Sequence, residues 1–144
     1  MNQHTLRNVS VILVLLSLVG CSGQPYKIVA ATGTVTLNGQ PAGGVEVQFC
    51  PDPEALTKGP SSLAETDDTG KFVLRYAVPG EAESKEGAVV GTHKVMLADL
   101  RQKPAPQGFP PNPSRVPILY GSLQTTPLRL EVKEGVGPLV NDVK

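Results

Sequence analysis

Few side chains in this sequence are suited to covalent or acid–base chemistry. The chain has two cysteines, Cys21 and Cys50, and two histidines, His4 and His93. Histidine is the usual proton carrier near neutral pH, but His4 lies close to the N-terminus, before a long apolar run. No Ser-His-Asp spacing, glycine-rich phosphate loop or Cys/His metal-binding pattern accompanies His93. The sequence therefore predicts a protein that is not an enzyme and that carries no cofactor and no metal ion.

Three features have both a chemical and a structural interpretation. Cys50 is either a nucleophilic or redox thiol or a half-buried cysteine at the end of a strand. His93 is either a ligand or a hydrogen-bonded histidine on an apolar strand face. Asp67 and Asp68 are either calcium ligands, which would need six or more oxygens around the ion, or residues that cap backbone amides in a turn. No partner residues accompany any of these at a suitable spacing, which favours the structural interpretation.

The first residues have the pattern of an export signal. A polar start with a single cation, Arg7, precedes an uninterrupted apolar run from Val9 to Val19. These eleven residues would form a helix only about 16 Å long, roughly half of the ~30 Å hydrocarbon thickness of a bilayer. The run therefore predicts a signal peptide that is removed, together with His4. It ends in the four residues Leu18, Val19, Gly20 and Cys21.

This ending resembles the lipobox of bacterial lipoproteins, with Cys21 as the acylated residue. The resemblance implies cleavage just before Cys21, a diacylglycerol on its sulfur with fatty-acid chains such as palmitate, and a place in the bacterial cell envelope. Such a multi-chain anchor is effectively permanent. Ser22 stands where inner-membrane lipoproteins carry aspartate, so we expect the outer membrane, with the domain facing the periplasm or the exterior. Cys50 would then be the only remaining thiol, and no intramolecular disulfide could form.

The rest of the chain predicts a turn-rich β domain. Gly and Pro number 15 and 14, while 40% of residues are hydrophobic, too many for disorder. Val45, Val47 and Phe49 alternate with polar residues, as expected for a strand with one buried face. About seven such strands, separated by turn signals, predict an all-β Greek-key sandwich. The expected strands are residues 32–37, 45–49, 62–66, 71–76, 92–98, 128–132 and 139–143.

Several of these segments resemble the carboxypeptidase regulatory-like domain, a transthyretin-like β-sandwich found in small bacterial lipoproteins. The resemblance is carried by residues 33–41, 44–49, 66–72 and 91–95, by Tyr120, and by residues 126–132. It implies a signal peptide over 1–20, a lipidated cysteine and short tether over 21–28, and one sandwich domain over 29–144. Tyr120-Gly121-Ser122 also has a faint similarity to the end of a transthyretin-like hydrolase, hydroxyisourate hydrolase. That enzyme's arginine and its several histidines have no counterparts here, so we do not expect hydrolase activity.

The balance of charges argues against nucleic acid as a partner. Thirteen basic and thirteen acidic residues give no net charge, so the chain lacks the basic surface of a nucleic-acid-binding protein. We expect a structural or interaction module that is held at the membrane by Cys21 and contacts an envelope protein or a glycan. The alternative is a carbohydrate-binding module, which usually presents several exposed aromatic rings. Only Phe109 and Tyr26 are expected to be exposed here.

Two long loops are the candidate contact surfaces, because irregular loops on a sandwich often carry recognition. Six prolines between residues 99 and 117 exclude that stretch from a central strand and predict an extended surface loop. Residues 81–86 form an acidic loop. The alternative is that both loops only connect strands. The candidate contact residues are Phe109, Pro110, Pro111, Glu81 and Glu83.

Overall fold

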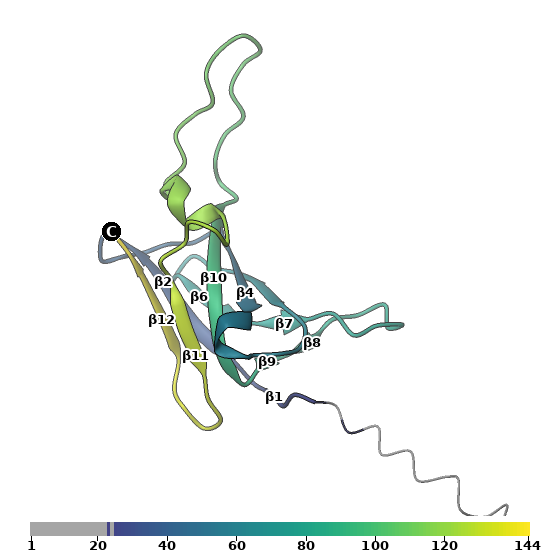
Figure 1. Ribbon diagram of the computed structural model, residues 1–144. Helices are drawn as coiled ribbons and strands as arrows, with labels where there is room; N and C mark the ends of the chain where they lie inside the picture. The colour runs from purple at the N-terminus through teal and green to yellow at the C-terminus, as the bar shows by residue number, and fades with distance from the viewer. Residues whose placement is uncertain (1–22, 24) are drawn as a thin grey trace, which may run out of the picture.

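The computed structural model describes residue 23 and residues 25–144 (Figure 1). The predicted lipobox, Leu18, Val19, Gly20 and Cys21, lies outside the described residues. The strands are β1 (Ile28–Val29), β2 (Thr32–Leu37), β3 (Gln40–Pro41), β4 (Val45–Pro51), β5 (Ser62–Glu65), β6 (Lys71–Val73), β7 (Arg75–Tyr76), β8 (Lys85–Glu86), β9 (Ala88–Val89), β10 (Gly91–Asp99), β11 (Arg129–Val132) and β12 (Leu139–Val143). Two 3-10 turns, η2 (Pro53–Ala55) and η3 (Ile118–Gly121), complete the described elements.

The strands form two main sheets, which confirms the predicted all-β class. The larger sheet has the order β11-β10-β4-β5-β7-β8, and the smaller one has the order β12-β2-β3, with β6 also paired to β2. β1 and β9 form a separate pair. All pairs in the described chain are antiparallel except β12 with β2, which is parallel. Figure 1 shows the loop after β11 leading into β12, where the chain passes from the larger sheet to the smaller one.

The core lies between the inner faces of the two sheets. Alternation along β4 places Val45, Val47 and Phe49 in it, as the sequence predicts, and β2 contributes Val35. The rings of Phe49 and Phe72 come from opposite sheets, and their centroids are 6.1 Å apart. Within the described residues, no helix is long and apolar enough to cross a membrane.

The segment 71–76 was expected to be one strand, but the structure divides it between the sheets. Asp67 donates its backbone N–H to the carbonyl of Lys71 over 2.8 Å, and the pair Leu63 and Arg75 continues that hairpin register. Between these points, however, β6 pairs with β2 instead of β5. This switch and several two-residue strands explain why the described residues contain twelve strands where about seven were predicted, because propensity patterns do not detect such short ladders.

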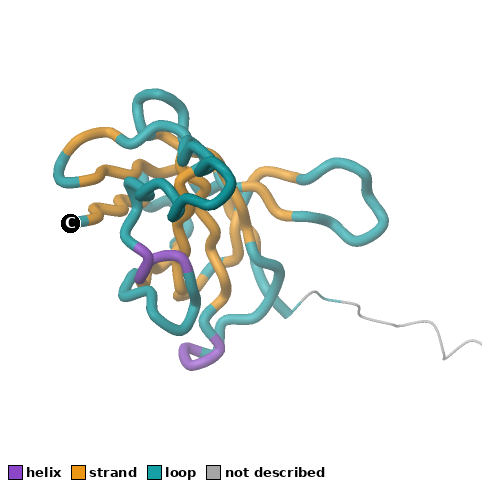
Figure 2. The backbone as a smooth tube through the Cα atoms, turned by 90° about the horizontal axis from the view of Figure 1, so that it is seen from above, coloured by secondary structure: helices purple, strands orange, loops and turns teal. Residues whose placement is uncertain are grey.

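Two long segments project from the sheets. The arm, which we define as residues 100–117, joins β10 to η3 and rises from one end of the domain (Figure 1). The hairpin loop, residues 77–84, joins β7 to β8 and extends sideways (Figure 2). The predicted acidic loop 81–86 is thus partly strand, because Lys85 and Glu86 pair with β7.

Candidate functional site

The base of the arm is closed by Asp99 and Arg115. The Asp99 carboxylate accepts hydrogen bonds from the backbone N–H of Arg115 (2.9 Å), from Arg115 Nε (3.0 Å), and from the backbone N–H of Arg101 (3.0 Å). The Asp99 side chain is almost completely buried. Hydrogen bonds and charge from Arg115 lower the pKa of Asp99 from 3.8 to about 2. Asp99 is therefore ionised at neutral pH and holds the two ends of the arm together.

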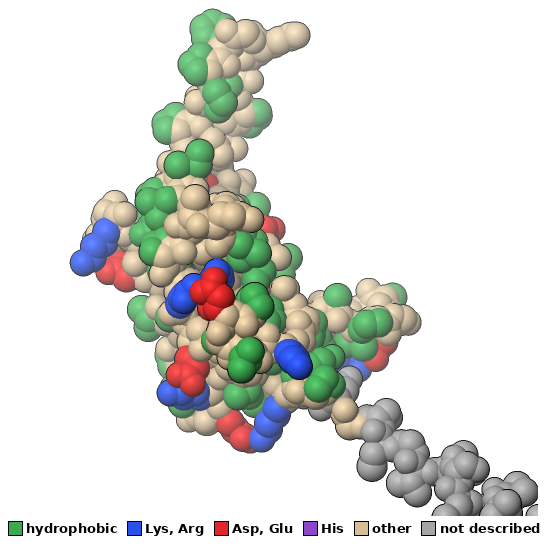
Figure 3. All heavy atoms as spheres, viewed as in Figure 1, with side chains coloured by type: hydrophobic (Ala, Val, Ile, Leu, Met, Phe, Trp, Pro, Cys, Tyr) green, Lys and Arg blue, Asp and Glu red, His purple; other side chains and the backbone are tan. Residues whose placement is uncertain are grey.

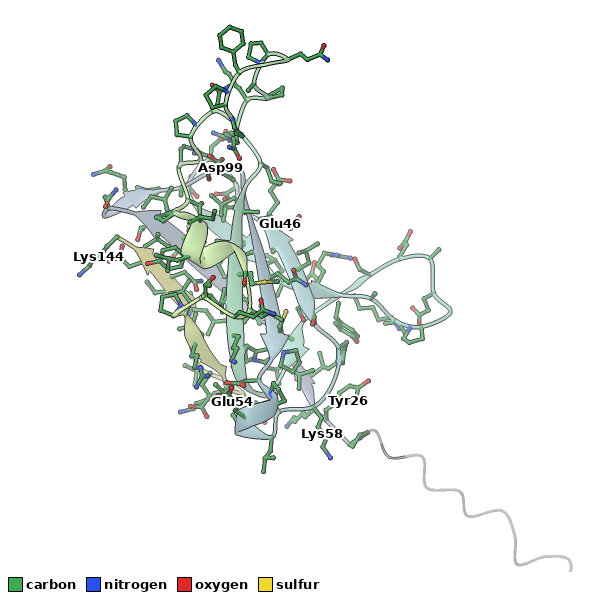
Figure 4. The ribbon with its side chains drawn as sticks, turned by 45° about the horizontal axis from the view of Figure 1, so that its top comes forward. Tyr26, Glu46, Glu54, Lys58, Asp99 and Lys144 are labelled. Carbon is green, nitrogen blue, oxygen red and sulfur yellow. The ribbon has the colours of Figure 1, made fainter. Side chains whose placement is uncertain are left out.

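The same end of the arm is attached to neighbouring loops. Arg115 Nη2 donates to the carbonyl of Gly43 over 3.1 Å, and the N–H of Leu100 donates to the carbonyl of Gly44 over 3.0 Å. Arg101 forms an ion pair with Asp68. Val116, near the end of the arm, and Tyr120, just after it, are both buried in the core. The arm thus rises from a fixed base, and Figure 4 shows Asp99 at this end of the domain.

The two sides of the arm are bound to each other along its length. Asn112 donates from its side-chain amide to the carbonyls of Lys103 (2.9 Å) and Pro104 (3.3 Å), and its own carbonyl accepts from the Gln102 side chain. At the tip, the N–H of Phe109 donates to the carbonyl of Pro106 over 3.1 Å and closes a turn. The arm is an ordered hairpin of extended chain, a feature that the proline count alone did not predict.

The surface of the arm is apolar and basic. Phe109 at its tip is 71% exposed, and Ile118 just beyond its base is 94% exposed. Five of the ten large hydrophobic side chains that are exposed in the described residues lie between positions 100 and 123. Residues 100–128 include three cations and no acidic residue. Figure 3 shows hydrophobic side chains along the arm, whereas the charged side chains on that face lie mainly on the body. A hollow of about 450 Å³ lies beside the base.

The predicted acidic residues lie on a different projection. Glu81 and Glu83 are exposed in the hairpin loop. Lys85 forms an ion pair with Glu81 over 2.8 Å, and Arg75 pairs with Glu86 over 3.1 Å, so part of the loop's negative charge is compensated. Figure 1 shows that this loop and the arm extend in different directions. The structure therefore does not bring the two groups of candidate contact residues together.

His93 is buried among the strands of the larger sheet and does not face solvent. Its side chain is fully buried, Nδ1 lies 2.9 Å from the carbonyl oxygen of Gly91, and its ring is 5.8 Å from that of Phe49. Desolvation lowers the pKa of His93 below its ordinary value, although the Gly91 carbonyl and the charge of Asp52 oppose part of this effect. His93 is therefore a neutral imidazole buried in the sheet, which agrees with the structural interpretation made from the sequence.

Asp52 and its neighbours hold the turn after β4 in place. The buried Asp52 carboxylate accepts the N–H of Glu54 at 3.1 Å, and Arg129 Nε lies 3.5 Å from its other oxygen. Glu54 also pairs with Arg129 at 2.7 Å and with Lys94 at 3.2 Å. These contacts join η2 to β10 and β11. Asp52 Oδ2 is buried and has the ion pair with Arg129 but no hydrogen bond, so the cluster links the turn to the sheet through mostly exposed ion pairs, which contribute little to stability.

Asp67 acts as a turn cap. Its Oδ1 accepts the N–H of Thr69 (2.8 Å), the hydroxyl of Thr69 (2.7 Å) and the N–H of Lys71 (3.0 Å). Gly70 supplies a positive φ of 76°, as the predicted turn requires. The hydrogen bonds from Thr69 and Lys71 lower the pKa of Asp67. No group of three or more metal-ligating side chains is found in residues 25–144.

Two further residues were singled out from the sequence: Cys50 as a candidate reactive thiol, and Tyr26 as an exposed aromatic side chain. Cys50 is a free, buried cysteine near the end of β4, outside the core cluster between the sheets. Tyr26 was expected to be exposed but is half-buried, because its ring packs over the bare backbone of Gly59. Phe109 is consequently the one aromatic side chain in the described residues that is exposed and not half-buried or buried. A flat platform of several aromatic rings, as sugar-binding surfaces usually have, is not formed there.

A groove beside β6 was not predicted from the sequence. It has a volume of about 720 Å³ and lies where β6 leaves β5 for β2. Phe72, Val73 and Pro138 contribute apolar surface, and Glu65 and Lys71 contribute charge. No sequence motif marks it, because its existence depends on the strand changing sheets.

Comparison of the chain with protein-family models, with curated proteins and with solved structures found no match. The likeness to the carboxypeptidase regulatory-like domain therefore rests on the residues named above and stays a prediction.

Proposed function

We propose that this chain is a lipid-anchored, non-catalytic lipoprotein of the bacterial envelope that presents its arm to a partner. The observation that carries the proposal is the ordered arm with exposed Phe109 at one end of the domain. The chain enters the domain at the other end, where Figure 4 places Tyr26 far from Asp99. An anchor at the N-terminal side would therefore direct the arm away from the membrane.

The tether supports this orientation. Seven positions separate Cys21 from the start of β1, so an extended chain would span at most about 25 Å between them. A domain held this close to a membrane keeps its β1 end near the surface and its arm distant from it. Ser22 after the proposed lipidated cysteine supports the outer membrane.

The proposal also includes the specific type of β-sandwich. A transthyretin-like Greek-key type is supported by the agreement between the resembling segments and the observed elements. Residues 33–41 form the β2–β3 hairpin, residues 44–49 enter β4, and residues 66–72 form the turn that places Phe72 in the core.

The anchor is tested by metabolic labelling with palmitate. The Cys21→Ala variant should incorporate no label and should accumulate as the uncleaved precursor. The matched control, Cys50→Ala, should be labelled and processed like the original chain, since its thiol is buried. Label retained by Cys21→Ala would refute the lipoprotein assignment.

The alternative function, carbohydrate binding, is tested with a glycan array and the unlipidated domain. We expect no reproducible binding, because Phe109 is the single exposed aromatic side chain in the described residues. Binding that is lost in Phe109→Ala would replace the interaction module with a carbohydrate-binding module.

A further inference from the structure

The arm has a backbone that its prolines hold extended. Proline restricts φ to about −65°, and the residue before a proline is pushed towards the β or polyproline II region. Together these two effects restrict every residue in two stretches, 103–106 and 109–113. Neither stretch belongs to a strand, and all five of their prolines are exposed. Both sides of the arm therefore present extended chain to solvent, in the β or polyproline II region, which is the backbone form that polyproline receptors recognise.

The contacts of Asn112 and Asp99 reduce the flexibility of this chain further. Asn112 binds the carbonyls of Lys103 and Pro104 across the arm, and Asp99 closes the base on Arg115. The turn at Phe109 fixes the tip. Little conformational entropy remains to be lost when such a segment binds a partner.

The charge on the arm indicates which charge its binding partner should carry. Arg115 and Arg101 are paired with Asp99 and Asp68, whereas no ion pair involves Lys103 in residues 25–144. No acidic residue occurs from 100 to 128. An acidic rim around an apolar groove would match this pattern.

We infer that the arm is a polyproline II ligand that docks into an aromatic-lined groove with an acidic rim on a partner protein. Aromatic-lined grooves are the common receptors for proline-rich segments, because they accept the ridges of a preformed polyproline II helix. Phe109 and the following Pro110-Pro111 form the apolar end of the ligand, and Lys103 contacts the rim. This inference rests on the proposed interaction function and names its partner class.

The test uses the full-length protein in isolated envelopes with a photo-crosslinking amino acid, benzoylphenylalanine, at one position. Position 109 samples the arm, and position 83 samples the hairpin loop. We expect a protein adduct from position 109 whose crosslinked partner peptide contains Trp or Tyr. Decaproline, added as a competitor, should reduce this adduct.

Matched proline variants separate polyproline recognition from other contacts. Pro110→Ala combined with Pro111→Ala should lower the adduct yield roughly four- to thirtyfold, since each proline limits the freedom of the unbound chain. Pro79→Ala, in the exposed hairpin loop, is the control and should leave the yield unchanged. Equal thermal unfolding of both variants will show that the domain is intact.

Each other outcome has a definite meaning. An adduct from position 109 with phospholipid, with a glycan strand or with a second copy of the chain would overturn the inference, as would a protein adduct that ignores decaproline and the proline variants. Such a protein adduct from position 109 would still leave standing the proposed function, in which the arm is presented to a partner. An adduct from position 83 alone would overturn both the inference and the proposal that the arm is the contact surface. The absence of adducts at both positions would count against both.

Discussion

Arg115 returns the chain to Asp99 after an excursion of sixteen residues and binds its buried carboxylate through both backbone and guanidinium. Arg115 also reaches the carbonyl of Gly43, in the loop before β4. The Arg115 side chain therefore links both ends of the arm to the loop between β3 of the smaller sheet and β4 of the larger sheet. This contact is one of several that fix the base of the arm.

Replacing the carboxylate in Asp99→Asn should destabilise the domain. The pKa of Asp99 is lowered from 3.8 to about 2 by Arg115. Since Arg115 is partly exposed, which weakens the pair, we expect a loss of about 1–2 kcal/mol in the free energy of unfolding near neutral pH. Chemical denaturation measures it. The control Glu81→Gln, which breaks an exposed ion pair, should have no measurable effect.

The same pair predicts an acid dependence. A carboxyl whose pKa is lower in the folded state contributes its stability fully above its unfolded value of 3.8 and loses it as the pH falls through about 2. The difference between the original chain and Asp99→Asn should shrink over this interval. A difference that stays constant down to about pH 2 would show that the charge of Asp99 is not the cause.

His93 predicts a second pH effect, at a higher pH. Burial lowers the pKa of His93 from 6.5, so below about 6.5 the unfolded chain binds a proton that the folded chain does not. Stability should therefore fall as the pH decreases below about 6.5. In His93→Leu this part of the decline should disappear. An unchanged slope in the variant would assign the effect to other groups.

At Gly33 there is no room for a larger side chain. A Cβ at this position would lie 2.4 Å from the Phe72 ring and 2.4 Å from the backbone oxygen of Leu139. Gly33→Ala should therefore lower the free energy of unfolding by about 1–3 kcal/mol through overpacking. Gly137→Ala is the control, because its Cβ would meet nothing within 4 Å. Equal unfolding midpoints for the two variants would mean that Phe72 and the neighbouring strand β12 shift easily to admit a Cβ at Gly33.

Cys50 should react slowly in the folded protein. It is buried and free, so iodoacetamide should modify it only after denaturation. Mass spectrometry before and after adding urea measures this directly. Rapid modification of the folded protein would instead support a reactive envelope thiol.

Much of the strand pattern could be predicted because alternation depends only on neighbouring residues. Val45, Val47 and Phe49 are buried on one face of β4, and Asp67 caps the turn before β6. Residues 71–76 show the limit of predicting strands from alternation alone. Their alternation is regular, but it carries no information on which strand each half pairs with.

Taken alone, the sequence determined the all-β class, the faces of the main strands and the exposed, extended chain between β10 and η3, since these follow from local alternation and from proline's missing N–H and restricted φ. Only the tertiary structure decided that β6 pairs with β2, that Asn112 binds Lys103 across the arm, and that Asp99 holds Arg115. The β6–β2 pairing is selected by the packing of two sheets around a shared core, and the other two contacts form only because the arm folds back on itself, which local alternation and proline content do not specify.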